Sequence, residues 1–183
     1  DEAVAAMSIV NRICFFVFAV GLGIGQGFQP VAAFNHGAKK FSRVKKSFYF
    51  TFVTGEILLG IFSVFGMFLS GRLIGLFRND PQVILIGTQA LRFQLAALVF
   101  QPVVICSNML FQSIGENKKA TFVSMLRNGI LFIPTILILC YFFGLLGVQL
   151  AQAAADVMSF FVTLPLVINF LQKLPKEESA QTA

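Results

Sequence analysis

The segment Gly25–Lys46, GQGFQPVAAFNHGAKKFSRVKK, decides how the chain is built. Its first part belongs to an apolar stretch that ends near Asn35-His36-Gly37. Five cations follow within eight residues: Lys39, Lys40, Arg43, Lys45 and Lys46. A cationic segment at the end of an apolar helix stays on the cytoplasmic side of a membrane because it resists translocation. The segment therefore predicts a membrane-spanning helix that reaches the cytoplasm near residue 35.

The composition around this segment is that of an integral membrane protein. The chain is 57% hydrophobic and 12% charged, with 23 Phe and a mean hydropathy of +0.83. Soluble domains carry about 25% charged residues. The net charge of +6 does not indicate nucleic acid as a partner, because the cations lie in short connections between apolar segments. Cys14, Cys106 and Cys140 lie inside apolar segments at no metal-ligand spacing, so no metal site is expected.

Five apolar segments are long enough to cross a bilayer as helices, which takes about 20 residues each. The predicted fold is therefore all-α, with residues 1–172 forming the transmembrane part and 173–183 a polar tail. The predicted spans are about 4–34, 47–71, 82–114, 120–143 and 146–171.

The charges of the connections predict the orientation. The segment 35–46, the connection near 115–119 and the tail together hold nine Lys and Arg residues, whereas the opposite side holds only Arg72 and Arg78. By the positive-inside rule the N-terminus is outside and the C-terminus is cytoplasmic. An odd number of spans with an external start suggests part of a longer protein.

Four charged residues lie deep in predicted spans: Glu56, Asp156, Arg12 and Arg92. A charge at that depth costs about 2.5–3.5 kcal/mol to insert, so it should face a polar cavity or an opposite charge. One interpretation is structural, with pairs such as Arg92–Glu56 or Arg12–Asp156 joining helices. The other is functional, with Glu56 or Asp156 exchanging the coupling ion of a transporter. We favour Asp156 for that role because small residues surround it.

Amide side chains form a second constellation. Gln94, Gln101, Asn108 and Gln112 follow one another at spacings of seven, seven and four residues, which places them on one helical face. Such a face either holds helices together or lines a cavity. Amides and Phe rings suit bulky organic cations. The candidate cavity-lining residues are Asn11, Arg12, Gln29, Arg92, Gln101 and Asn108.

The prolines and glycines inside the predicted spans also have both a structural and a functional interpretation. Pro102, Pro134 and Pro165 lie inside predicted spans and indicate either ordinary kinks or bends that move during transport. The glycines from Gly21 to Gly27 indicate either close helix packing or a cavity wall.

No enzymatic motif is present. His36 is the only histidine, and the sequence holds no metalloprotease or phosphate-loop signature. We therefore do not expect an enzyme, and we expect no cofactor other than a coupling ion, H⁺ or Na⁺.

The opening segment resembles the multidrug and toxic compound extrusion (MATE) transporters. Its run G-x-G-Q-G-x-Q-P, followed by N-x-G-A-K and R-V-K, is similar to the end of the eighth helix in that family. Further segments agree in order: SGRLIGLFRND, FQPVVICSNMLFQSIGENKKA and YFFGLLGVQLAQAAAD. The resemblance covers nearly the whole chain. It implies twelve helices in two six-helix lobes, with the five spans being helices eight to twelve.

One position departs from the family pattern. Sodium-coupled bacterial members carry an acidic ligand in the tenth helix, about eleven residues before its closing motif. If Phe111-Gln112-Ser113 aligns with that motif, the matching position is Gln101, a neutral amide. The resemblance then places coupling at Glu56, Asp156 or a carboxylate of the first lobe.

The resemblance implies a cation-coupled antiporter that exports amphiphilic, mostly cationic drugs. Its partners would be the lipid bilayer, the drugs and an N-terminal lobe. A lipid-linked oligosaccharide flippase of the same superfamily is an alternative, but it should have a more cationic cavity than Arg12 and Arg92 provide. A membrane assembly subunit without transport activity is the alternative from another class.

Overall fold

The structure is a computed structural model that describes residues 2–175, so residues 176–183 of the predicted tail lie outside the described residues. Within this range every secondary-structure element is a helix. Three long spans are α1 (Glu2–Gly37), α2 (Phe41–Phe77) and α7 (Leu145–Lys173). A fourth runs from Asn117 to Phe143, and the bent pair α3 (Pro81–Leu98) and α4 (Gln101–Ser113) makes a fifth. The all-α membrane fold is confirmed.

The connections are shorter than the hydropathy suggests. α1 ends at Gly37 and α2 begins at Phe41, so most of the basic segment 35–46 is helical. Lys39, between them, adopts a left-handed backbone with φ of 58°. At its C-terminal end, α2 continues to Phe77, through most of the connection expected between the predicted spans 47–71 and 82–114. Asp80 then caps α3 by accepting a 3.0 Å hydrogen bond from the Gln82 amide, with Pro81 in the first turn.

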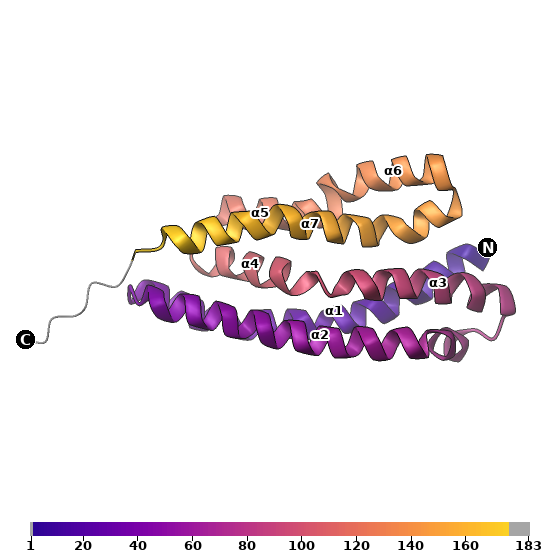
Figure 1. The fold of residues 1–183 in the computed structure, drawn as a ribbon, viewed down its shortest axis with the longest axis horizontal. Coiled ribbons are helices and arrows are strands. Elements are labelled where there is room, and N and C mark those ends of the chain that lie inside the picture. The colour runs from indigo at the N-terminus through magenta and orange to yellow at the C-terminus, as the bar shows by residue number, and fades with distance from the viewer. Residues whose placement is uncertain (1, 176–183) are drawn as a thin grey trace, which may run out of the picture.

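The broken third span lies at the centre of the lobe. In Figure 1 α3 and α4 run between α1 and α2 on one side and α5 to α7 on the other. α3 packs against α1, α2 and α7, and α4 packs against α1, α2, α5 and α7. Gln94 and Gln101 of this span are therefore surrounded by protein helices instead of lipid.

The break in the third span lies at Val99 and Phe100, just before Pro102. α3 and α4 meet there at an angle of 52°. Pro102 has no amide hydrogen to donate to the carbonyl of Leu98, which interrupts the helical ladder. Gly55 of α2 leaves room for the proline, since a Cβ at Gly55 would lie 3.4 Å from the Pro102 Cβ. The kink predicted from Pro102 is present.

The fourth span changes its helical pitch at mid-length. It consists of α5 (Asn117–Met125), the π-helix η1 (Leu126–Ile130) and α6 (Phe132–Phe143). The wider turn is closed by the Leu131 amide, which donates to the Leu126 carbonyl at 3.0 Å. Pro134 follows shortly after η1 and removes a further donor. Single π-turns of this kind frequently occur at functional sites. By contrast, α7 continues as a helix through Pro165.

Two glycines of α1 allow α4 to approach closely. A Cβ at Gly25 would lie 2.9 Å from Ile105 and 3.0 Å from Met109, and one at Gly21 would lie 2.9 Å from Ile105. At Gly23 and Gly27 a Cβ would meet nothing within 4 Å. Helix packing therefore explains Gly21 and Gly25, whereas the other two glycines face open space.

The apolar core is divided into two clusters. One surrounds Phe28, Phe48 and Phe111 near the α1–α2 connection, and the other surrounds Val10, Ile74 and Leu91 near the α2–α3 connection. Phe18 of α1 packs against both clusters. The polar side chains Gln94 and Gln101 lie along the central span between them. The middle of this lobe is therefore its polar part.

Candidate functional site

Two adjoining cavities open at the middle of the lobe. The larger has a volume of about 300 Å³ and the smaller about 110 Å³. Phe18, Arg127 and Asn128 line both cavities. α1 supplies one wall, and α3, α4, α5, η1 and α7 supply the others. We call the two cavities together the polar crevice.

Arg127, which lines the polar crevice, forms an ion pair with Asp156, which lines neither cavity. The Arg127 Nε donates to the Asp156 Oδ1 at 2.9 Å, and the Gln152 Nε2 donates to the same oxygen at 3.0 Å. The side chain of Asp156 is 4% exposed and that of Arg127 is 19% exposed. Breaking such a buried pair by removing one partner typically costs about 3–5 kcal/mol, because the remaining charge is left uncompensated.

Arg127 also lies against an aromatic ring. Its Cζ is 4.1 Å from the centroid of the Phe18 ring, which is within the range of a cation–π interaction. Phe18 belongs to α1 and Asp156 to α7, so one guanidinium connects η1 to two other helices. The wider turn of η1 is the local feature that presents Arg127 in this position.

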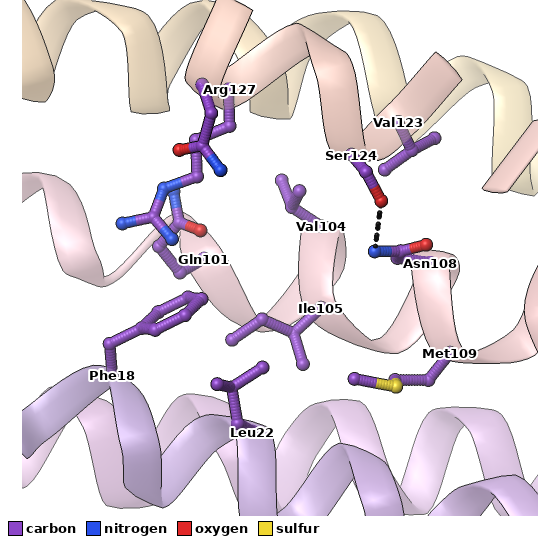
Figure 2. A pocket seen from close by; sticks show the side chains of 11 residues that line it. Phe18, Leu22, Gln101, Val104, Ile105, Asn108, Met109, Val123, Ser124 and Arg127 are labelled. Atoms are coloured by element: carbon purple, nitrogen blue, oxygen red, sulfur yellow. Dashed lines mark hydrogen bonds between the residues drawn. The ribbon is translucent and has the colours of Figure 1, made fainter. Parts of the chain in front are cut away.

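The smaller cavity contains an unusual amide. Gln101 is fully buried, and neither its Oε1 nor its Nε2 has a hydrogen-bond partner. Figure 2 shows it together with Arg127 and Phe18 among the residues that line this cavity. A buried amide without partners is costly, so each such group needs an explanation.

Two other residues of the predicted amide face, Asn108 and Gln112, belong to a hydrogen-bonded chain. Gln29 of α1 donates to Gln112 at 3.1 Å, Gln112 donates to Asn108 at 3.1 Å, and Asn108 donates to Ser124 of α5 at 2.8 Å. Figure 2 shows the last of these bonds. Asn108 lines the smaller cavity, so the chain connects three helices at the edge of the polar crevice.

The structure brings together only some of the candidate residues. Asn11 lines the larger cavity, whereas Gln101 and Asn108 line the smaller one. Arg12, which follows Asn11 on α1, is exposed. The Arg92 Nε donates to the Ser70 hydroxyl of α2 at 3.0 Å, and Arg92 lines neither cavity. Gln29 reaches Asn108 only through Gln112.

Of the two candidate coupling carboxyls, only Asp156 contacts the polar crevice, through Arg127 and Gln152. Neither considered pair, Arg92–Glu56 or Arg12–Asp156, is among the salt bridges of residues 2–175. Within that range Glu56 has no cationic group within 4.0 Å, and it lies partly buried on α2. No group of three or more His, Cys, Asp and Glu side chains is placed to hold a metal ion in the described part of the chain.

Arg127, the partner of Asp156, is not among the residues that the sequence predicted for the site. It lies inside the predicted span 120–143 and is followed directly by Asn128. Two consecutive polar residues within an apolar span are costly in a bilayer. This pair was therefore a usable signal for a polar site at that depth.

Comparisons with known proteins agree with this architecture. The MatE family model matches residues 1–138. The multidrug export protein MepA of Staphylococcus haemolyticus is 22% identical over 180 residues, which are 98% of this chain and 39% of that protein. MepA of Staphylococcus aureus strain NCTC 8325 is 24% identical over 183 residues, again 39% of its length. The chain thus spans about two fifths of the relatives that it matches.

Solved structures show the same arrangement of helices. A crystal structure of MATE in complex with MaL6 superimposes with a TM-score of 0.88 at 18% identity, covering 95% of this chain and 40% of that one. The MATE multidrug transporter DinF-BH is 34% identical with a TM-score of 0.74, covering 89% of this chain and 36% of that one. The family match over most of the chain and this shared fold establish that the chain belongs to the MatE family of membrane transporters.

Proposed function

We propose that this chain forms helices eight to twelve of a two-lobe antiporter that exports amphiphilic, mostly cationic compounds. The observation that carries the proposal is the polar crevice itself. It places a buried carboxylate, an arginine, amides and a Phe ring at mid-depth in an apolar helical lobe. Polar and ionisable groups are costly at that depth and typically mark a transport pathway.

The relatives support this direction of transport. MepA is a multidrug export protein, and DinF-BH is a MATE multidrug transporter. In transporters built from repeated lobes, the substrate site lies near the midplane between the lobes, and the lobes rock around it. We propose an N-terminal lobe as the partner that completes the cavity. The bilayer covers the outward apolar faces of α2 and α6, such as Phe68 and Tyr141.

The coupling ion is H⁺ or Na⁺, and Asp156 is the better candidate for its site. Asp156 is buried against the polar crevice, whereas Glu56 lines neither of the two cavities described above. Gln101, which has no ionisable group, does not replace the acidic ligand that the family resemblance suggests for sodium-coupled members. The protein would act in the plasma membrane, with the basic segment 35–46 and the C-terminus in the cytoplasm.

Transport by the complete protein in proteoliposomes tests the proposal. An imposed inward gradient of H⁺ or Na⁺ should drive ethidium against its own gradient, and collapse of that ion gradient should stop it. A matched empty liposome gives the passive rate. Ethidium movement at the passive rate under both ion gradients would contradict the proposed export function.

A further inference from the structure

Arg127 holds the position that a bound organic cation would need in this crevice. Its guanidinium is 4.1 Å from the Phe18 ring and is bonded at 2.9 Å to the Asp156 carboxylate. An aromatic face together with a buried carboxylate is a pairing that attracts delocalised and quaternary cations. The Phe18 ring and the Asp156 carboxylate therefore form a cation site, and the Arg127 guanidinium occupies it.

A ligand has a route to this position. The larger cavity, about 300 Å³ in volume, is lined by Phe15 and Phe18 as well as Arg127. Its volume lies at the lower end of small-molecule pockets, which span roughly 300–1,000 Å³. Gln152, which already donates to Asp156, lines the same cavity. A cation entering there would meet the Phe18 ring directly, and it would reach the Asp156 carboxylate where Arg127 moves away.

Arg127 also has an alternative partner on its other side. The smaller cavity is lined by Gln101, whose Oε1 is a fully buried acceptor without a donor. Arg127 lines this cavity too, so both side chains border the same space. A guanidinium has five N–H donors, so it can satisfy that oxygen after leaving Asp156. The unpartnered state of Gln101 is thereby explained as a vacant second position for Arg127.

From these contacts we infer that Phe18 and Asp156 form a binding site for a lipophilic organic cation, occupied in this structure by Arg127 as a resident, displaceable cation. The ligand and Arg127 compete for the same ring and carboxylate. Displacement moves the guanidinium toward Gln101, and the bound ligand then replaces it as the positive partner of Asp156. This inference rests on the proposed export function and identifies the site and class of its substrate.

Removal of the resident cation is the direct test. In the complete, purified transporter, Arg127→Gln should bind tetraphenylphosphonium about tenfold more tightly than wild type, a change of about 1.4 kcal/mol. The same ligand should raise the melting temperature of Arg127→Gln more than that of wild type, because it replaces the missing partner of Asp156. Phe18→Leu should weaken binding in both backgrounds.

Two controls separate charge competition from other effects. Arg72→Gln removes an exposed cation of α2 remote from the crevice and should leave tetraphenylphosphonium affinity at the wild-type value. Triphenylphosphine oxide, a neutral analogue, should bind Arg127→Gln and wild type equally. An equal gain for the neutral compound would mean that Arg127→Gln only enlarges the cavity, and this would overturn the inference.

The outcomes also separate this inference from the proposed function. Wild-type binding and export of the cation, with unchanged or weaker binding by folded Arg127→Gln, would refute the resident-cation site and leave export intact. Binding by neither protein would refute both. If Arg127→Gln binds the cation more tightly than wild type and the wild-type transporter does not export it, the result would support the binding site and contradict the export function.

Discussion

Asp156 and Glu56 lie at similar depth in their helices, but their surroundings differ. Asp156 accepts hydrogen bonds from Arg127 and Gln152 and is nearly inaccessible. Glu56 is partly buried on α2 next to Gly55, which packs against Pro102. The cost of a charged group in an apolar span is offset in the first case by an ion pair. The second acid has no cationic side chain close by in residues 2–175.

Glu56→Gln is therefore expected to leave transport nearly unchanged. The amide keeps the shape of the side chain and removes a charge that no cation within the described lobe compensates. Gradient-driven ethidium efflux by the complete transporter should stay within about twofold of wild type, because Glu56 lines neither cavity of the polar crevice. Loss of efflux at normal protein abundance would instead assign the coupling ion to Glu56.

At the scale of elements, the glycines of α1 determine how closely α4 can approach. Gly25 faces the branched Cγ2 of Ile105, which cannot move away as the tip of a flexible chain would. Gly25→Ala should destabilise the protein by about 1–3 kcal/mol through overpacking. Gly23→Ala is the matched control, because a Cβ there would meet nothing within 4 Å. Thermal unfolding of the purified variants measures the difference, and equal melting temperatures would contradict the close α1–α4 packing.

The sequence predicts the elements well because their signals are local. Span length, apolar composition and the cationic segment after Gly37 suffice for five helices, and Pro102 marks the bend. The identity of the residue that pairs with Asp156 depends on contacts between helices that are distant in the sequence. Periodicity shows which face of a helix a residue occupies, but not which other helix lies opposite. The π-turn at Leu126–Ile130 adds a shift that an α-helical wheel does not contain, so the direction in which Arg127 points does not follow from the sequence.

At the scale of the whole molecule, the charge distribution predicts the orientation of the chain in the membrane. Ala38 lies exposed in the basic connection and Asn79 lies exposed in the connection after α2. In a background without the three native cysteines, Asn79→Cys should react with a membrane-impermeant thiol reagent in intact cells, and Ala38→Cys should react only after the cells are opened. The reverse pattern would invert the proposed topology.

The proposed lobe should not transport without its partner. Exposed polar groups of the crevice, such as Asn11 and Asn128, would face lipid or water where a second lobe is expected. We predict that cells expressing residues 1–183 alone show no ethidium efflux above vector controls, at a membrane abundance verified by immunoblot. Efflux from this chain alone would overturn the two-lobe assignment.

The most direct measurement of the central claim, that the crevice beside Asp156 couples the ion gradient to export, is efflux by Asp156→Asn in the complete transporter. Asp156→Asn leaves Arg127 without its carboxylate partner, so the abundance of the variant in the membrane is measured alongside and efflux is expressed per transporter. Gradient-driven ethidium efflux should fall at least about tenfold, the scale expected when a group that acts at each cycle loses its charge. Wild-type efflux from Asp156→Asn at wild-type abundance would contradict the claim and move coupling to the other lobe.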